Sequence, residues 1–265
     1  MTTRYVFDFS EGDKEQKALL GGKGANLAEM VKIGLPVPPG FTITTDACRA
    51  YLTKGKAPKE LEAEVTEHLA TIEKAMGRRL GDPENPLLVS VRSGAMFSMP
   101  GMMETVLNIG LNDDSVLGLA GLAGERFAWD SYRRLLQMFG KTVLGIDSEV
   151  FEARIEQVKN ARKVHQDTEL TAADLAALCG TFKTAIFNAT GERFPQDPRE
   201  QLDAAVEAVF RSWSGERAVL YRRQERIPND LGTAVNVQTM VFGNMSDDSG
   251  TGVCFTRDPS TGEKG

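Results

Sequence analysis

The chain has 265 residues, of which 41% are hydrophobic and 26% are charged, a composition typical of a folded globular protein and not of a disordered one. A formal net charge of −6 with scattered basic residues argues against a protein that coats nucleic acid, but it allows an anionic small ligand. Three widely separated cysteines, Cys48, Cys179 and Cys254, predict neither a disulfide frame nor a zinc site, and we expect each side chain to be buried.

The N-terminal part predicts helices alternating with short strands. Its first residues have no signal-peptide pattern and no apolar run is long enough to span a membrane, so we expect a cytoplasmic protein that does not contact membranes. A glycine turn at 21–24 should lead into a helix that ends near 33, before Gly34 and Pro36. A strand at 41–43, a helix near 46–53 capped by Thr44 or Thr45, and an amphipathic helix at 59–76 should follow.

The segment 87–110 combines two strand patterns with an unusual loop. An apolar run at 87–91 stops at Arg92, and a loop rich in glycine and methionine separates it from a second strand at 105–109. Arg92 is open to two interpretations, a phosphate ligand or a structural arginine that pairs with a carboxylate at the strand end. The methionines favour adaptable packing, with a mobile lid as the functional alternative.

Beyond residue 113 the patterns become helical and then return to strand. Helices are expected at 114–123, 125–139, 148–161 and 171–190, with Asp147 or Ser148 and Thr171 as caps, and one more at 198–213. Strands should follow at 233–242 and in the TGVCFT segment, 251–256, on either side of a turn at 243–250. His68 and His165 lie in polar, helical settings, so we expect both to be solvated surface residues without a catalytic partner.

Two segments have the chemistry of an anion site. Glycine-rich backbone and helix N-termini offer unpaired N–H groups, and this pattern occurs at 21–24 beside Lys23 and at 94–103 after Arg92. Lysine adds a point charge and arginine a fork that matches phosphate oxygens. Together the two segments predict a cleft for a polyphosphate, although 21–24 alone can be read as a plain helix-start turn.

Several blocks of sequence resemble the pyruvate, phosphate dikinase family nearly end to end. The blocks are GGKGANLAEM at 21–30, GLPVPPGFTITT at 34–45, LLVSVRSGA at 87–95, SMPGMMETVLNIGLND at 98–113, YRRLLQMF at 132–139, TAVNVQTMVFGN at 233–244 and SGTGVCFTRDPSTGEKG at 249–265. The resemblance implies an α+β fold, namely an ATP-grasp-like first lobe at 1–112 and 198–243 with an all-helical inserted subdomain at 113–197. Residues 244–265 would only begin the second lobe.

The same resemblance implies a phosphotransferase that converts ATP, phosphate and pyruvate to AMP, diphosphate and phosphoenolpyruvate. The phosphorylated histidine would lie outside this chain on a swivelling domain, and a further domain would bind pyruvate, so no catalytic residue is expected here and this chain alone should be inactive. Mg²⁺ would accompany ATP, with protein ligands beyond Gly265 and none within the chain. The full-length enzyme would be a homodimer.

The resemblance also assigns the residues that would bind ATP. Lys23 and Arg92 would hold phosphates, 101–105 would form the mobile loop, and the backbone of 238–241 would face the adenine. The residues so assigned are Lys23, Arg92, Gly101, Met102, Met103, Glu104, Thr105, Gln238, Thr239, Met240 and Val241.

Two other functional readings remain open. One is the nucleotide-binding part of a related dikinase that uses water or a glucan as acceptor, which the SMPGMMET segment disfavours. The other is a non-catalytic module that keeps the fold.

Overall fold

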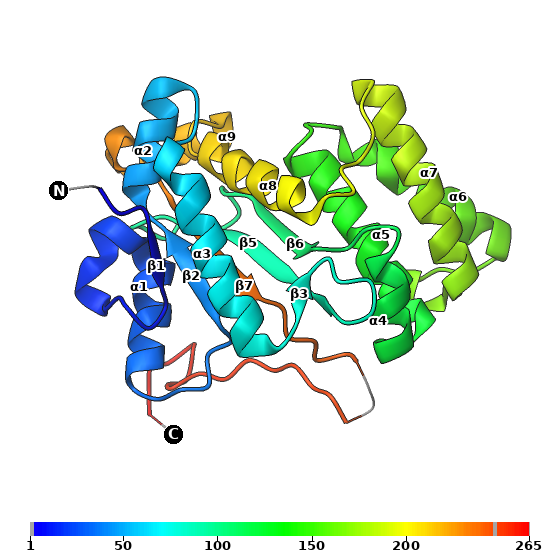
Figure 1. Ribbon diagram of the computed structural model, residues 1–265, viewed down its shortest axis with the longest axis horizontal. Helices are drawn as coiled ribbons and strands as arrows, with labels where there is room; N and C mark the ends of the chain where they lie inside the picture. The colour runs from blue at the N-terminus through cyan, green and yellow to red at the C-terminus, as the bar shows by residue number, and fades with distance from the viewer. Residues whose placement is uncertain (1–2, 246–247, 265) are drawn as a thin grey trace.

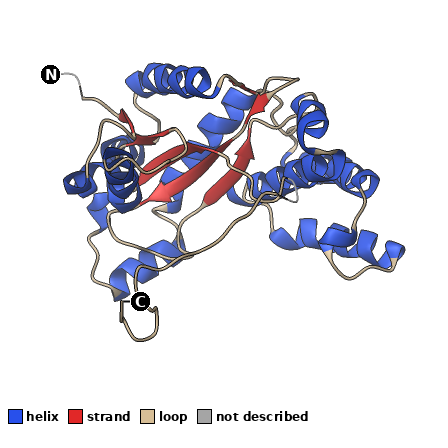
Figure 2. Cartoon of the chain, turned by 90° about the horizontal axis from the view of Figure 1, so that it is seen from below, coloured by secondary structure: helices blue, strands red, loops and turns tan. Residues whose placement is uncertain are grey.

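The computed structural model describes residues 3–245 and 248–264, and its centre is a five-stranded antiparallel sheet. The strand order is β1-β2-β7-β5-β6, so the last strand of the described chain lies in the middle of the sheet. Figure 2 shows the strands packed among the helices. The strands are β1 Val6–Asp8, β2 Gly40–Ile43, β7 Ala234–Thr239, β5 Val89–Gly94 and β6 Thr105–Ile109. A separate parallel pair joins β3, Arg79–Leu80, to β4, Pro86–Leu87.

The two faces of the sheet differ in chemistry. The register pairs Arg92 with Asn236 and with Thr105, and it pairs Ser90 with Gln238, so these polar side chains share one face. The alternate residues on the other face are fully buried and mostly β-branched or aromatic: Phe41, Ile43, Val89, Val91, Val106, Val235 and Val237. The sheet therefore buries one face in the core and carries polar groups on the other.

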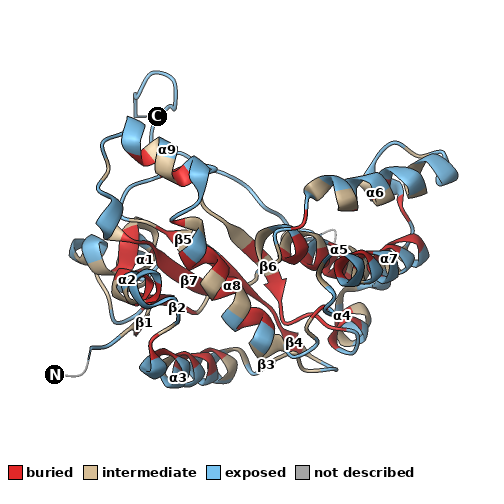
Figure 3. Cartoon of the chain, turned by 90° about the horizontal axis from the view of Figure 1, so that it is seen from above, coloured by how far each residue is buried: buried red, intermediate tan, exposed pale blue. Residues whose placement is uncertain are grey.

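Helices cover the sheet unequally. The helices are α1 Lys17–Lys32, α2 Thr45–Lys54, α3 Lys59–Met76, α4 Ser115–Ala123, α5 Glu125–Thr142, α6 Ser148–Arg162, α7 Ala172–Thr190, α8 Pro198–Ser212 and α9 Glu216–Gln224, with short 3-10 turns at Lys14–Gln16, Asp167–Glu169 and Asn229–Leu231. In Figure 1, α4 to α7 gather at the side of the sheet next to β6, and α1 to α3 lie at the other side. Burial concentrates on the strands and the inner sides of α5, α7 and α8, whereas α6 and the C-terminal segment are largely exposed (Figure 3).

The mixed fold and most element positions agree with the sequence. Helix and antiparallel sheet occur together, which confirms an α+β chain, and the strand predicted at 105–109 has those bounds. The four helices predicted between 114 and 190 are present, and Asp147 and Thr171 cap two of them by accepting backbone N–H groups. Thr44 likewise caps α2. The division into two lobes and an insert stays a prediction.

Three predictions from the sequence are wrong. The TGVCFT segment at 251–256 forms no strand, and Cys254 is exposed, because nothing in the described chain pairs with that segment or covers it. His68 is 7% exposed and not a solvated residue, because its side chain points from α3 toward the edge strand β1.

The turn predicted at 243–250 includes residues 246–247, which lie outside the described residues. In the described part of the chain, no helix is both long and apolar enough to cross a bilayer.

Candidate functional site

The two glycine-rich segments that the sequence singled out touch each other through their backbones. Gly21 has φ 67° and kinks α1, and a Cβ at this position would overlap the carbonyl oxygen of Gly94. The amide of Gly22 donates to the carbonyl oxygen of Ala95 at 3.0 Å. Only glycine tolerates both the left-handed backbone and this close approach. The amide of Gly22 is therefore used for packing and is not available as part of an anion cradle.

A cleft of about 670 Å³ lies between α1 and the loop that follows β5. On the α1 side it is lined by Lys17, Lys23 and Asn26, and on the other side by residues of the loop 94–103. Its polar groups thus include two lysines and a side-chain amide. A cleft with this lining is suited to an anionic ligand.

Lys23 is the half-buried cation of this cleft. Burial lowers the pKa of Lys23, and the positive charge of Arg92 lowers it further. Two cations are therefore held close enough to repel each other in the absence of a ligand. An anion placed between them would remove that cost, because an opposite charge favours the protonated lysine.

Arg92 lies on the polar face of the sheet, in a smaller hollow of about 380 Å³ next to the cleft. Thr105 lines both spaces. Arg92 is exposed, and its side chain makes neither an ion pair nor a hydrogen bond with any residue that the structure describes. The interpretation of Arg92 as a structural arginine paired with a carboxylate therefore has no support here, and its guanidinium is free to bind a ligand.

The segment 238–241 lines the same hollow but is largely tied into the sheet. The amide of Thr239 donates to Pro39, the amide of Met240 donates to Leu88, and the carbonyl oxygen of Gln238 accepts from the hydroxyl of Ser90 at 3.3 Å. Within the described chain, the carbonyl of Met240 and the amide of Val241 make no hydrogen bond. In this segment, these two neighbouring groups are therefore the backbone groups that remain available to bind a ligand.

The loop 101–105 is divided between the cleft and the helices. Gly101, Met103 and Thr105 line the cleft. Met102 packs against a separate apolar cluster, and Glu104 accepts a hydrogen bond from Thr142 at 3.2 Å. Nine of the eleven residues assigned from the resemblance therefore meet in the two adjoining spaces, whereas Met102 and Glu104 turn away.

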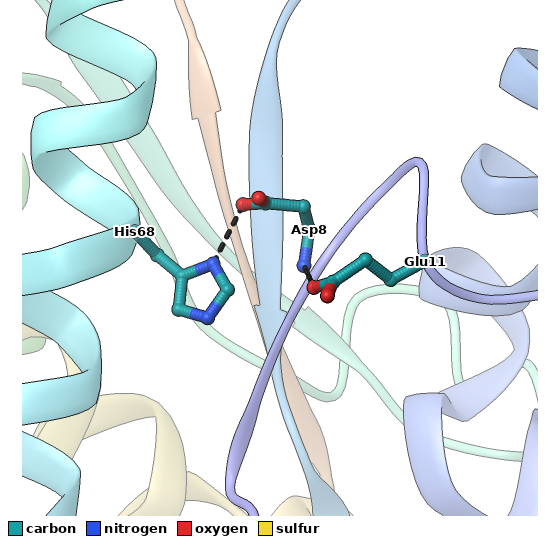
Figure 4. A group of neighbouring side chains, drawn as sticks. All are labelled: Asp8, Glu11 and His68. Atoms are coloured by element: carbon teal, nitrogen blue, oxygen red, sulfur yellow. Dashed lines mark hydrogen bonds and ion pairs between the residues drawn. The ribbon is translucent and has the colours of Figure 1, made fainter.

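No carboxylate lines either space among the described residues, so the residues present do not fit a Mg²⁺ site, which requires oxygen ligands with carboxylates prominent. A group with metal-ligand chemistry, Asp8, Glu11 and His68, lies elsewhere, between β1 and α3 (Figure 4). Its members satisfy one another: His68 Nδ1 is 2.7 Å from Asp8, and Glu11 accepts from the Asp8 amide and pairs with Arg4. This group is a set of hydrogen bonds that connects α3 to the edge strand β1.

Two residues of the site region were missed from the sequence. Asn26 lies three positions after Lys23 on the same face of α1, so helical spacing could have identified it. Asn236 is 1% exposed; its Oδ1 accepts from Thr42 at 2.9 Å, while its Nδ2 lies above Gly94 with no partner among the described residues. No local pattern marks Asn236, because it sits in an ordinary strand sequence.

Comparison with known proteins gives a family match along most of the chain. The family model described as "Pyruvate phosphate dikinase, AMP/ATP-binding domain" matches residues 17–64 and 53–265. The chain is 57% identical over 268 residues to "Pyruvate, phosphate dikinase, chloroplastic" of Flaveria pringlei, with 99% of the chain and 28% of that protein covered. It is 59% identical over 264 residues to the protein of the same name from Mesembryanthemum crystallinum, with 98% and 28% covered.

Two consequences follow from these relatives. The chain spans 28% of their length, so it corresponds to one part of a much larger protein. The expectation of a cytoplasmic protein is contradicted, because these relatives and that of Oryza sativa subsp. japonica are named as chloroplastic. A location cannot be derived from the absence of a signal-peptide pattern in such a part.

Proposed function

The chain belongs to the pyruvate phosphate dikinase AMP/ATP-binding domain family, and from that premise we propose that it is the ATP-binding portion of an enzyme that converts ATP, phosphate and pyruvate to AMP, diphosphate and phosphoenolpyruvate. The relatives are named as pyruvate, phosphate dikinases, and the chain covers 28% of the length of each. The observation that carries the proposal is the position of Lys23 and Arg92 in two adjoining spaces that share Thr105, close enough for the charge of Arg92 to lower the pKa of Lys23.

The two cations would act by neutralising phosphate charge. Phosphoryl transfer depends mainly on positioning and on stabilising charge that spreads over phosphate oxygens, so lysine, arginine and backbone donors are the groups expected. Lys23 would offer a point charge from the α1 wall of the cleft, and Arg92 a fork from the sheet, with Gly101 and Met103 of the loop beside them. The free guanidinium of Arg92 and the depressed pKa of Lys23 support this role.

The adenine would bind at the end of β7. Its Watson–Crick edge has a donor amino group, which a free backbone carbonyl can accept from, next to an acceptor nitrogen. The free carbonyl of Met240 can accept from the amino group, whereas the free amide of Val241 belongs to the same trans peptide and points the opposite way. Gln238 and Thr239 would hold this segment in place through their bonds to Pro38 and Pro39.

Mg²⁺ would enter with the nucleotide. Because the described residues of the cleft provide no carboxylate, the ion would be held by the phosphates and by ligands from elsewhere in the longer protein. Residues 1–112 and 198–243 would form the first lobe of an ATP-grasp-like fold, residues 113–197 a helical insert, and 244–265 the start of a second lobe. A phosphohistidine domain, a pyruvate-binding domain and a second copy of the full-length enzyme would be its partners.

The direct test is calorimetric titration of Mg-ATP into this chain and into its Lys23→Ala variant, with circular dichroism to verify folding. We expect binding that the variant weakens. Equal binding by both proteins would refute the role of Lys23. Absence of binding to a well-folded chain would instead favour a module that keeps the fold and needs the rest of the enzyme to hold nucleotide.

A further inference from the structure

The loop that lines the cleft is seated on an apolar cluster separate from the main core. Met99 is 7% exposed although its neighbours Ser98 and Pro100 are exposed, and it packs with Trp213 and Ala218. Met102 and Met103 lie around the same cluster. Methionine side chains thus fasten a cleft-lining loop to the corner between α8 and α9.

The surface that receives Met99, formed by Trp213 and Ala218, is held in place by polar contacts that do not involve the loop. The indole nitrogen of Trp213 donates to the carbonyl oxygen of Asn229 at 2.8 Å. Arg222 stacks on the indole ring at 4.0 Å, donates to the carbonyl oxygen of Trp213 at 2.6 Å and to Asn229 Oδ1 at 3.0 Å. Because none of these contacts involves a loop residue, the surface that receives Met99 is preformed.

Met99 divides the loop into two halves with different freedom. The first half is tied at both ends, by the Gly22–Ala95 hydrogen bond and by Met99 on Trp213. In the second half, Pro100 and Gly101 are exposed, Gly101 has φ 73°, and no atom lies within 4 Å of where its Cβ would be. Pro100 and Gly101 therefore form an exposed turn without packed contacts, closed by the hydrogen bond from the Met102 amide to the Met99 carbonyl oxygen at 3.1 Å.

We propose that Trp213 is a positioning residue for the loop: by holding Met99 it fixes residues 94–99 and confines ligand-induced movement to the turn at residues 100–101, since Met102 and Met103 pack on the same cluster. The inference rests on the proposed function only for the identity of the ligand, Mg-ATP. The alternative, in which the whole segment 94–104 closes as one lid, would require Met99 to leave a preformed apolar seat and expose the indole to water. That cost disfavours the single lid.

Tryptophan fluorescence can test this directly, because the chain has two tryptophans, Trp129 and Trp213. In a Trp129→Phe background, emission and acrylamide quenching report on Trp213 alone. Met99→Ala should increase quenching several-fold and raise hydrogen exchange in residues 96–99, while Met99→Leu should restore both. Leu220→Ala, which removes a side chain 55% exposed on neighbouring α9, should change neither and serves as the matched control.

Adding Mg-ATP tests the division of the loop. In the Trp129→Phe protein, saturating Mg-ATP should slow exchange of the Gly101 amide, since Pro100 has none, and leave quenching of Trp213 unchanged. Met99→Ala should bind Mg-ATP roughly three- to tenfold more weakly, or about 0.7–1.4 kcal/mol, because the freed loop must be ordered on binding.

Several results would overturn the proposal: increased Trp213 quenching on ligand binding, unchanged quenching in Met99→Ala, or unchanged affinity in that variant. If no variant binds Mg-ATP, the proposed function fails for this chain, while the quenching and exchange measurements without nucleotide still decide whether Met99 on Trp213 fixes the loop.

Discussion

Replacing Arg92 with alanine should weaken nucleotide binding while leaving the fold intact. The side chain is exposed and has no ion pair or hydrogen bond in the described part of the chain, so its loss should change the free energy of unfolding by no more than about 0.5 kcal/mol. Hydrogen bonds from a charged group to phosphate contribute about 1.5–3 kcal/mol. The expected loss in affinity for Mg-ATP is therefore about 10- to 150-fold.

Calorimetric titration and thermal unfolding, carried out on the same samples, separate binding from folding. Arg92→Lys should recover only part of the affinity, because it keeps the charge and loses the planar fork. Arg79→Ala removes another exposed arginine, on β3 and outside both spaces, and should bind Mg-ATP normally. A large fall in melting temperature with unchanged affinity for Arg92→Ala would refute the reasoning, as would equal weakening by Arg79→Ala.

Three further predictions concern stability and pH. Gly21→Ala should lower the free energy of unfolding by more than about 2 kcal/mol, from left-handed strain plus overlap with the opposing carbonyl, whereas Gly180→Ala, with open surroundings in α7, should not be destabilising in urea unfolding. Because burial lowers the pKa of Lys23, affinity for Mg-ATP should decline with rising pH earlier than for an ordinary lysine, and Lys23→Arg should remove the decline in titrations across alkaline pH. Burial acts to lower the pKa of His68, but the hydrogen bond to Asp8 and the nearby negative charges together outweigh it, so the pKa is raised overall. The contact of His68 with Asp8 should therefore add to the free energy of unfolding at low pH, and this contribution should be lost as the pH rises through the pKa of His68. An unchanged dependence of stability on pH in Asp8→Asn would contradict this.

Much of the fold could be predicted because its signals are local. The strand 105–109 and the helix 59–76 have the bounds that periodicity gives, and Thr44 and Thr171 cap helices through contacts within three residues along the chain. The sequence also predicted one phosphate cleft for Lys23 and Arg92, and the structure places the two residues in adjoining spaces. The strand, the helix and the caps depend on residue type and local spacing alone, whereas the proximity of the two cations depends on the fold.

The rest depends on contacts between distant parts of the chain. His68 was expected at the surface because its own helix is polar there, and its burial comes from a strand 60 positions away. The 251–256 segment has strand-forming residues, but a strand needs a neighbour, and the described chain offers none. The packing of Trp213 against the loop could not be predicted from local sequence patterns, because more than 100 residues separate Trp213 from Met99.

The contact between Gly21 and Gly94 affects how well contacts in this fold can be inferred from a set of related sequences. Methods that infer proximity from correlated substitutions need both partners to vary, and a compensating change in one must rescue a change in the other. A backbone-to-backbone contact that excludes any Cβ permits no such compensation. The contact of Gly21 with Gly94 should therefore leave no covariation signal, while side-chain pairs such as Thr42 and Asn236 can report only the neighbouring pairing of β2 with β7.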